Sequence, residues 1–260
     1  MIFLIAESKT MTPCDGAVAP ALYRNNIPEY ASQADSIMLS LRHMSADELT
    51  AKVKISAAMA SHLRDMIYEF PAKGMGTRAI EAFTGVVFKA FDYATLGKEA
   101  RKRADASVRI VSSLYGWLRP RDIIKAYRFD FTTRLAPDGG TFAAYWRNAV
   151  TDALLAETAN RRCPIAVDLM PGDAAKCLDR RRLADRVRIV RIDFKEMRPG
   201  GTLRTPDAGR LKKLRGTLLR QIIEHGAETP DDIRALSSPC YMAEPCDTDS
   251  DTIVFSTLPD

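Results

Sequence analysis

The most constraining feature of the sequence is a short segment that is apolar on both of its faces. Residues 2–6 read IFLIA, and the polar residues Glu7-Ser8-Lys9-Thr10 follow at once. A strand with one solvent-exposed face alternates apolar and polar residues, so a run without a polar position is typical of a strand inside a covered sheet. A second segment of this kind, residues 164–170 (PIAVDLM), ends at Pro-Gly-Asp. These two strands predict an α/β protein with a buried central sheet.

Other segments have the patterns of helices and strands that would surround such a sheet. Ser45 is followed three residues later by Glu48, which is the capping-box pattern of a helix start. Residues 142–159 and 207–226 carry apolar residues at helical spacing, and Gly226 is placed to end the second helix. We also expect two or three helices over 29–69, a short capped helix over 229–236, and strands over 186–194 and 251–258.

The chain has one kind of organisation from end to end. Its 260 residues include no internal repeat, no low-complexity segment and no change of composition that would mark a linker. With 46% hydrophobic residues, a chain of this length can bury its own core. We therefore predict a single domain over residues 1–260, of mixed α/β class, with a central mixed sheet flanked by helices. Periodicity alone does not decide between helix and strand for residues 79–96 and 108–116.

The composition argues against several functional classes. The five cysteines include no Cys-x-x-Cys pair, and the three histidines are not spaced as metal ligands. These counts disfavour a disulfide framework, a zinc site and an iron store. The first residues are apolar without a preceding basic segment, and no apolar run approaches the length of a membrane span. We expect a reduced, cytoplasmic protein with no cofactor, no metal and no membrane partner.

Cationic side chains are the most prominent functional feature, and they occur in three clusters. Lys and Arg number 38 against 33 Asp and Glu, so the distribution of charge matters more than the net +5. Such clusters can follow a phosphate backbone if folding brings them to one surface, although most runs of charge are solvated helix faces. The clusters are Arg119, Arg121, Lys125 and Arg128; Lys176, Arg180, Arg181, Arg182, Arg186, Arg188 and Arg191; and Arg210, Lys212, Lys213, Arg215 and Arg220.

The first cluster follows a glycine turn. Residues 112–124 read SSLYGWLRPRDII, in which Gly116 permits a tight turn and Pro120 suits the start of a helix. The free backbone N–H groups at such a helix start bind phosphate in helix-hairpin-helix elements. We therefore predict a helix-hairpin-helix-like element here, with Tyr115, Gly116 and Pro120 at its turn. The alternative is a structural turn whose aromatic residues pack in the core while Arg119 pairs with a carboxylate.

These segments also resemble a known family. SSLYGWLRPRDIIKAYRFDF is similar to the Leu-Ser-Gly-Leu-Tyr-Gly-x-Leu-Arg-Pro-x-Asp motif of the peroxide stress protein YaaA family and to the Pro-Tyr-Arg-Leu-Glu block after it. Further similar segments occur in the family's order over nearly the whole chain. They are the Lys-Thr pair after the first strand, AFTGVVFKAFD, YWRNAVTDAL, VDLMPGDAAK and KKLRGTLLRQII. The sequence is thereby identified as a member of this family.

The resemblance implies both a fold and a role. It implies the family's mixed α/β fold with a helix-hairpin-helix element and a basic cleft. It also implies largely sequence-independent binding of duplex or distorted DNA, and a role in limiting iron-driven DNA damage under hydrogen peroxide. The matching positions are Lys9, Thr10, Tyr115, Gly116, Arg119, Pro120, Asp122, Tyr127, Arg128, Lys176, Lys212, Arg215 and Arg220. The chain departs from the family pattern at Ala6, Glu7, Ser8, Asp168, Pro171, Asp173 and Ala174.

Two functional hypotheses follow from these residues and this resemblance. The first is a DNA-binding protein of the peroxide stress response. In that hypothesis the phosphate-binding residues are Lys9, Arg119, Arg121, Arg128, Lys176, Lys212, Arg215 and Arg220. A DNA-binding site of this kind predicts an open groove, and its affinity would fall steeply with salt.

The second hypothesis is an enzyme that acts on a small phosphorylated, nucleotide-like or carboxylate substrate. Its pocket would be lined by Lys9, Arg119, Tyr127, Arg128, Lys176 and Lys212. The candidate catalytic groups are Lys9, Tyr127, Lys176 and Asp122, as bases, acids or a Schiff-base former. A compact void that gathers Lys9, Arg119 and Lys176 would favour this small anionic ligand over DNA.

Overall fold

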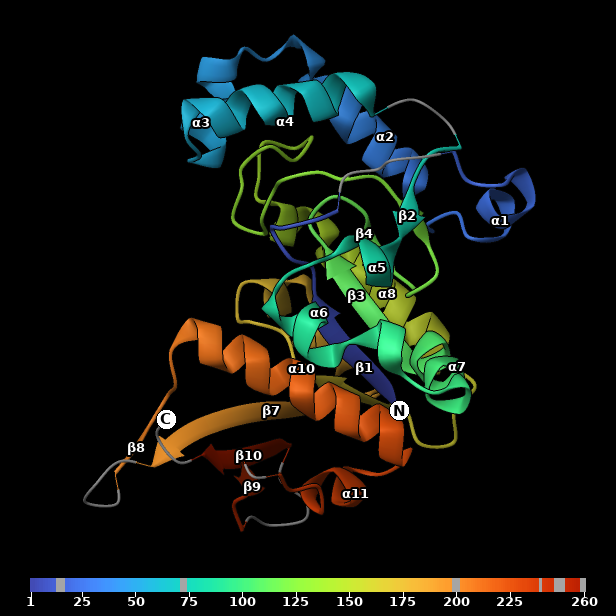
Figure 1. Ribbon diagram of the computed structural model, residues 1–260, viewed down its shortest axis with the longest axis vertical. Coiled ribbons are helices and arrows are strands. Elements are labelled where there is room, and N and C mark those ends of the chain that lie inside the picture. Colours follow the sequence, from blue (N-terminus) through green and yellow to red (C-terminus); the bar gives the residue numbers. More distant parts are fainter. Residues whose placement is uncertain (13–16, 71–73, 198–201, 239, 246–250, 258–260) are drawn as a thin grey trace.

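A central sheet organises the protein, as the interior strands predict. The computed structural model describes residues 1–12, 17–70, 74–197, 202–238, 240–245 and 251–257 (Figure 1). The strands of the sheet are β1 (Ile2–Ala6), β3 (Val108–Ser112), β4 (Gly116–Leu118), β6 (Ile165–Asp168), β7 (Arg188–Met197), β8 (Leu203–Arg204), β9 (Met242–Ala243) and β10 (Thr252–Thr257). Their order is β4-β3-β1-β6-β7-β10-β9, with β8 paired to β7.

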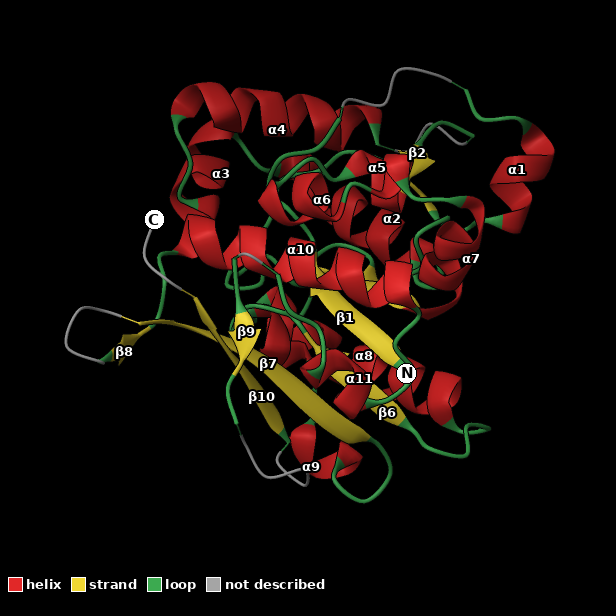
Figure 2. Ribbon diagram, turned by 60° about the horizontal axis from the view of Figure 1, so that its bottom comes forward, coloured by secondary structure: helices red, strands yellow, loops and turns green. Residues whose placement is uncertain are grey.

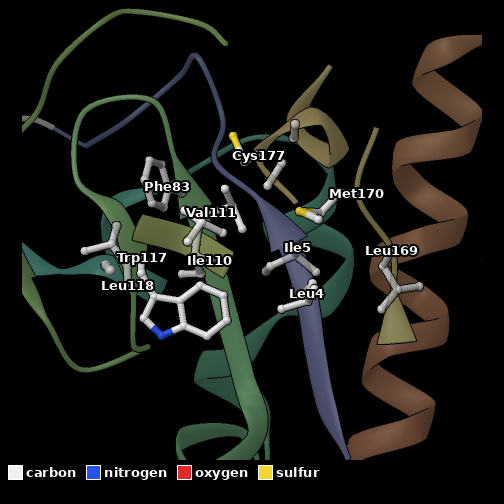
Figure 3. Close-up of a cluster of buried hydrophobic side chains, with 14 of the residues drawn as sticks. Leu4, Ile5, Phe83, Ile110, Val111, Trp117, Leu118, Leu169, Met170 and Cys177 are labelled. Atoms are coloured by element: carbon white, nitrogen blue, oxygen red, sulfur yellow. The ribbon is translucent and has the colours of Figure 1, made fainter. Parts of the chain in front are cut away.

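The inner strands of this sheet are parallel. Parallel pairs join β3 to β1, β1 to β6, β6 to β7 and β7 to β10, whereas β4, β8 and β9 are antiparallel additions. In the centre, Leu4 and Ile5 of β1 lie between Ile110 of β3 and Leu169, which follows β6 (Figure 3). The mixed sheet and the two predicted interior strands are therefore confirmed.

Strand β7 differs from β1 because only one of its faces is covered. Val190, Ile192 and Phe194 are buried, whereas Arg191 between them is exposed and Asp193 is half-buried. This is the period-two pattern predicted for residues 186–194. One face of the sheet therefore meets solvent at β7, and Arg191, Asp193 and Lys195 lie on that face, whereas Glu196 is buried on the other.

Helices cover the two faces of the central strands. α6 (Val86–Phe91), α7 (Lys98–Ser107) and α10 (Ala208–His225) lie in front of the sheet in Figure 1, and α8 (Phe142–Thr158) lies behind it. α10 packs closely on α6, because a Cβ atom on Gly216 would come within 2.3 Å of the Val87 carbonyl oxygen. The predicted helices over 142–159 and 207–226 are confirmed, and Gly226 ends α10 with a left-handed φ of 68°.

A helical layer lies beyond one end of the sheet, at the top of Figure 1. It comprises α2 (Ala31–Ser40), the 3₁₀ turn η1 (Leu41–His43), α3 (Ala46–Val53) and α4 (Ala57–Glu69). The predicted capping box is present, because Ser45 Oγ accepts from the Glu48 N–H and Glu48 Oε2 accepts from the Ser45 N–H. α3 ends at Lys54, whose left-handed φ of 56° separates it from α4.

The remaining elements are short. They are α1 (Pro20–Asn25), α5 (Ala79–Ala82), η2 (Tyr93–Thr95), η3 (Ala174–Cys177), α9 (Arg180–Leu183), α11 (Pro230–Arg234) and a separate two-stranded pairing of β2 (Thr77–Arg78) with β5 (Ile123–Ile124). Figure 2 places α9 beside β7 and β10. Residues 79–96 thus form three short helical elements, with Phe83 between the first two in an isolated β-bridge to Met11. The capped helix predicted over 229–236 is confirmed by α11. Among the described residues, no helix has both the length and the apolar character needed to cross a membrane.

Residues 108–118 form a β-hairpin, so the helix-hairpin-helix-like element predicted over 112–124 is wrong. β3 pairs antiparallel with β4, with Ser112 opposite Gly116. Gly116 has a left-handed φ of 68°, and a Cβ atom there would lie 2.5 Å from the Trp146 ring. Trp117 is fully buried and holds the second strand against the core, which a solvent-facing helix start would prevent. The turn residues Tyr115 and Pro120 are buried as well, as the structural alternative predicted.

Candidate functional site

The ends of three parallel strands bring polar residues to one edge of the sheet. β1 ends before Glu7, β3 ends at Ser112 and β6 ends at Asp168. β1 is in the middle of these three, and the chain continues first to β3 on one side and later to β6 on the other. In open α/β sheets, ligands bind beside the carboxyl ends of strands where the strand order reverses in this way. The edge between β1 and β6 is therefore a candidate ligand-binding edge.

Glu7 is the central carboxylate at this edge. Its Oε2 accepts hydrogen bonds from the Tyr127 hydroxyl and from the Ser113 N–H, the latter at 2.8 Å. Its Oε1 is shielded from solvent and has no hydrogen-bond partner among the described residues. Burial raises the pKa of Glu7 to about 7, against the opposing effect of these hydrogen bonds. The group can therefore hold or release a proton near neutral pH.

Tyr127 joins Glu7 to the hairpin turn. The Tyr127 and Ser112 hydroxyl oxygens are 2.7 Å apart, and Ser112 Oγ also accepts from the Tyr115 N–H at 2.9 Å. Burial raises the pKa of Tyr127 well above its ordinary value, and the neighbouring Glu7 carboxylate adds to this shift. The phenol is therefore a donor to Glu7 rather than an acid that releases its proton. The sequence predicts Tyr127 as a catalytic candidate. Its hydrogen bond to Glu7 becomes visible only in the folded structure.

Lys9 and Arg128 lie together just outside this cluster. Lys9 Nζ is 2.8 Å from Asp130 Oδ2, and Arg128 Nη1 donates to the Lys9 carbonyl oxygen at 2.9 Å. Burial disfavours ionisation of Asp130, but the hydrogen bonds from Lys9 and Thr132 outweigh it and lower the pKa of Asp130 to about 2. The Lys9 side chain is 62% exposed, so its ammonium group is a solvated, paired cation.

The carboxyl end of β6 carries a second charged cluster. Asp168 is 2% exposed, accepts from the Met170 N–H at 3.0 Å and pairs with the Arg180 guanidinium. The half-buried Arg215 of α10 interacts electrostatically with Asp168 and Asp173, and its Nε is shielded from solvent without a hydrogen-bond partner among the described residues. Burial lowers the pKa of Arg215 and raises that of Asp168. The ionised forms of Asp168 and Arg215 therefore stabilise each other against the cost of burial.

Arg180 connects this cluster to a groove of about 1250 Å³, which we call the arginine groove. The groove lies along the first residues of β6 and β7 and past η3 and α9, on the face of β7 that carries Arg191. Its walls hold many more cations than carboxylates. The Lys and Arg residues are Arg147, Arg162, Lys176, Arg180, Arg186, Arg188 and Arg191, and the carboxylates are Asp185 and Asp251.

The eight predicted phosphate-binding residues are not all at this groove. Of that set, Lys176 lines the arginine groove, whereas Arg119 lines a second concavity beside α8. Arg121 Nε is 3.3 Å from Asp105 Oδ2, and Arg220 is paired with Glu224 at 2.8 Å. Both of these guanidinium groups are therefore already neutralised.

The remaining members of the predicted set occupy other surroundings. Arg128 contacts the loop that carries Lys9, Lys212 is exposed on α10, and Arg215 is half-buried at Asp168. That these eight residues bind phosphate together as one set therefore stays a prediction. Of the catalytic candidates, Lys9 is paired with Asp130, Tyr127 is bound to Glu7, and Lys176 is exposed in the groove. Asp122 is buried beside the concavity that holds Arg119.

Sequence reasoning found most of the groove but missed two of its arginines. The second basic cluster of the sequence includes Lys176, Arg180, Arg186, Arg188 and Arg191, which all line the groove. The two missed residues are Arg147, within α8, and Arg162, just after it. Arg147 is an isolated cation between uncharged neighbours, and Arg162 has only Arg161 beside it, so local charge density did not mark either one. The contact that brings Arg147 in is its Nε donating to the Lys176 carbonyl oxygen at 3.1 Å.

Comparison with known proteins gives one consistent result. Residues 1–246 match the sequence profile of a family described as peroxide stress protein YaaA. A UPF0246 protein of Francisella philomiragia is 28% identical over 245 residues, which cover 93% of this chain and 94% of the relative. A UPF0246 protein of Francisella tularensis subsp. mediasiatica is 28% identical over 262 residues, covering 98% of this chain and 100% of the relative. The similarity therefore extends through both charged clusters and the arginine groove.

Proposed function

The chain belongs to the peroxide stress protein YaaA family, and on this premise we propose that it binds the phosphate backbone of DNA in the arginine groove. The observation that carries the proposal is the gathering of Lys and Arg side chains from α8, η3, α9 and β7 around one concave surface. A polyanion is the ligand that complements such a surface, because each bound phosphate neutralises one cation and releases a counterion. Binding of this kind requires no catalytic group.

Several of these cations are available for a ligand. Arg180, Arg188 and Arg191 are paired with Asp168, Asp251 and Asp193, respectively. In contrast, Arg147, Arg162, Lys176 and Arg186 are exposed and form no ion pair within the described part of the chain. Phosphate contacts from these four side chains position a duplex without reading its bases, so we expect little dependence on DNA sequence.

The separation of Lys176 from Arg119 bears on the enzyme hypothesis. Those residues line two different concavities, and Lys9 is held by Asp130. A small substrate bound at one of these places would not contact the other two residues. This arrangement favours binding of an extended anion over binding of a small substrate in a single pocket formed by Lys9, Arg119 and Lys176.

The proposal is tested by the salt dependence of duplex binding. Fluorescence anisotropy with a labelled DNA duplex gives the affinity of the wild type and two variants over a series of salt concentrations. We expect Arg186→Gln to lower the slope of log affinity against log salt by about 0.9, the share of one phosphate. The matched control is Arg181→Gln, because Arg181 is an exposed arginine of α9 that is not part of the groove lining.

Two results would contradict the proposal. Absence of duplex binding by the wild type at low salt would exclude the function itself. Equal losses of slope in Arg186→Gln and Arg181→Gln would exclude the groove, because the loss would then reflect the net charge of the protein. Binding that depends on base sequence would require contacts other than those to phosphate.

A further inference from the structure

The segment that carries the family motif does not line the arginine groove. Instead Trp117, Arg119 and Asp122 line a second concavity of about 450 Å³, which we call the Asp122 pocket. Its other walls come from α8 and from the segment before α2, and they consist of Ile27, Glu29, Ala153, Ala156 and Glu157. Pockets that hold small molecules have volumes of roughly 300–1,000 Å³. The Asp122 pocket therefore has the size of a small-ligand site.

One of the three carboxylates in this pocket is already neutralised. Arg109, whose side chain is 8% exposed, donates from Nε to both oxygens of Glu157 at 2.8 Å, and its Nη2 is 2.8 Å from Glu157 Oε2. The Trp117 indole N–H donates to Glu157 Oε1 at 3.2 Å. Glu157 is thus held in place in the wall of the pocket, and its negative charge is already neutralised by Arg109.

Asp122 is compensated less completely than Glu157. The residue is 6% exposed, and its Oδ2 accepts the Arg119 N–H at 2.8 Å. Within the described residues it forms no ion pair, because the Arg119 guanidinium lies near Glu157 Oε1, at 3.8 Å, with a side chain that is 60% exposed. Buried carboxylates are normally paired with a cation, since burial without one is costly. A buried, unpaired carboxylate that faces a cavity indicates that a ligand supplies the cation.

The surroundings of Asp122 define the chemistry of that ligand. The exposed Glu29 places a second negative charge at the pocket, whereas Ile27, Ala153 and Ala156 offer apolar contacts. Among the described residues, no group of three His, Cys, Asp or Glu side chains is arranged to hold a metal ion. The complementary ligand therefore carries its positive charge on N–H donors and has an apolar body.

We propose that the Asp122 pocket binds a small organic cation, with an ammonium or guanidinium group on a short aliphatic chain. The N–H donors of the ligand bind the Asp122 carboxylate in a charge-assisted hydrogen bond, and Glu29 adds to the attraction at the rim. The aliphatic chain packs on Ile27 and Ala156. This site is independent of the arginine groove, because the two concavities share no lining residue.

The test uses agmatine, a guanidinium on a four-carbon chain with a terminal amine, as the probe. Isothermal titration calorimetry on the full chain measures its affinity, and 1-butanol is the uncharged comparison. We expect Asp122→Asn to weaken agmatine binding at least about tenfold, because the isosteric amide can still accept from the Arg119 N–H but carries no charge. The matched control is Asp138→Asn, because Asp138 also accepts a backbone N–H in a turn, from Gly140, and is exposed.

The pH dependence provides a second readout that does not require a variant. Burial raises the pKa of Asp122 to about 6, although Arg119 and Arg109 favour its ionised form, and the negative charge of Glu29 adds to the rise. Affinity for agmatine should therefore fall as the pH is lowered through about 6, as the carboxylate is protonated. If Asp122→Asn does not fold, Glu29→Gln replaces it, and a loss of about threefold is expected from the exposed charge.

Specific outcomes would overturn the inference. They are the absence of agmatine binding by the wild type, equal binding of agmatine and 1-butanol, or an affinity for agmatine that does not change on acidification through pH 6. Equal affinities in the wild type and Asp122→Asn would also overturn it. Loss of duplex binding in Arg186→Gln concerns the arginine groove alone, so a failure of either proposal can be told apart from a failure of the other.

Discussion

The hydroxyl of Tyr127 donates a hydrogen bond to the carboxylate of Glu7, which lies 120 residues earlier in the chain. The contact joins the loop after β5 to the end of β1, at the edge where the strand order of the sheet reverses. Both groups are shielded from solvent, and burial raises the pKa of each. A carboxylate held in this way makes the stability of the fold depend on pH near neutrality.

Glu7→Gln should remove part of that pH dependence. Because burial raises the pKa of Glu7 from 4.5 to about 7, the folded protein keeps this proton at pH values where the unfolded chain has released it. The free energy of unfolding should therefore fall as the pH rises from 4.5 to about 7, by about 1.4 kcal/mol per pH unit at most. Urea unfolding of the wild type and Glu7→Gln across this range measures the difference.

The difference between the two proteins is the informative quantity. Burial also raises the pKa of Asp122 to about 6, so the wild type retains a slope of the same sign from that residue. Subtracting the Glu7→Gln curve removes this shared contribution. A variant curve parallel to that of the wild type would show that Glu7 has an ordinary pKa in the folded protein.

Tyr127→Phe should destabilise the fold by about 1–3 kcal/mol, because it deprives the buried Glu7 carboxylate of a donor. Ser112 Oγ, which lies 2.7 Å from the lost hydroxyl, also loses a partner. Tyr145→Phe is the matched control, since Tyr145 is half-buried and its ring packs edge-on against Trp146. Thermal unfolding of both variants checks the prediction, and equal stabilities would contradict it.

Gly116→Ala should distort the β3–β4 hairpin. Gly116 and Gly139 have similar left-handed φ angles of 68° and 75°, so alanine costs about 1 kcal/mol of backbone strain at either position. Only at Gly116 would the new Cβ atom meet Trp146, at 2.5 Å, whereas Gly139 has nothing within 4 Å. We expect Gly116→Ala to be less stable than Gly139→Ala by a further 1–3 kcal/mol, roughly the cost of overpacking, in urea unfolding. Equal losses would show that Trp146 moves aside freely.

Gly216→Ala should separate α10 from α6. The added methyl group would lie 2.3 Å from the Val87 carbonyl oxygen and 2.8 Å from Ala90 Cβ, and a backbone atom cannot rotate away. We expect a loss of about 1–3 kcal/mol or more, against at most about 1 kcal/mol for Gly97→Ala, which meets nothing within 4 Å. Chemical denaturation gives both values. A Gly216→Ala protein as stable as the wild type would mean that the helices pack less closely than the structure describes.

Asp130→Ala should destabilise the protein more than Lys9→Met. The Lys9 side chain is 62% exposed, and exposed ion pairs contribute about 0–1 kcal/mol. Asp130 Oδ1 additionally accepts hydrogen bonds from the Thr132 N–H and from the Thr133 hydroxyl, so its loss should cost about 1–2 kcal/mol. Because the pKa of Asp130 is lowered to about 2, its contribution should be present above pH 4 and fall as the pH approaches 2. A double-variant cycle separates the ion pair from the turn.

Much of the secondary structure follows from local patterns. The apolar run 2–6, the Ser45–Glu48 capping box and the alternation at 186–194 each indicated the correct element. The helix-hairpin-helix prediction for 112–124 is wrong because Gly116 suits the turn of a β-hairpin as well as the turn before a helix. The β-hairpin is decided by contacts with distant residues, above all Trp146 on α8 against Gly116. No local pattern contains that contact.

The sequence by itself determined which segments are buried strands and amphipathic helices. The reason is that burial of one face of a helix or strand places apolar residues at a regular spacing, which is visible in the sequence alone. It also determined the family and the presence of clustered cations. Only the tertiary structure decided which cations remain available: Arg121 meets Asp105 and Arg220 meets Asp92, whereas Arg186 lines the arginine groove. The physical reason is that a charge is neutralised by an opposite charge only within a few ångströms. For Arg121 and Arg186, the packing of elements distant along the chain decides whether such a charge is present.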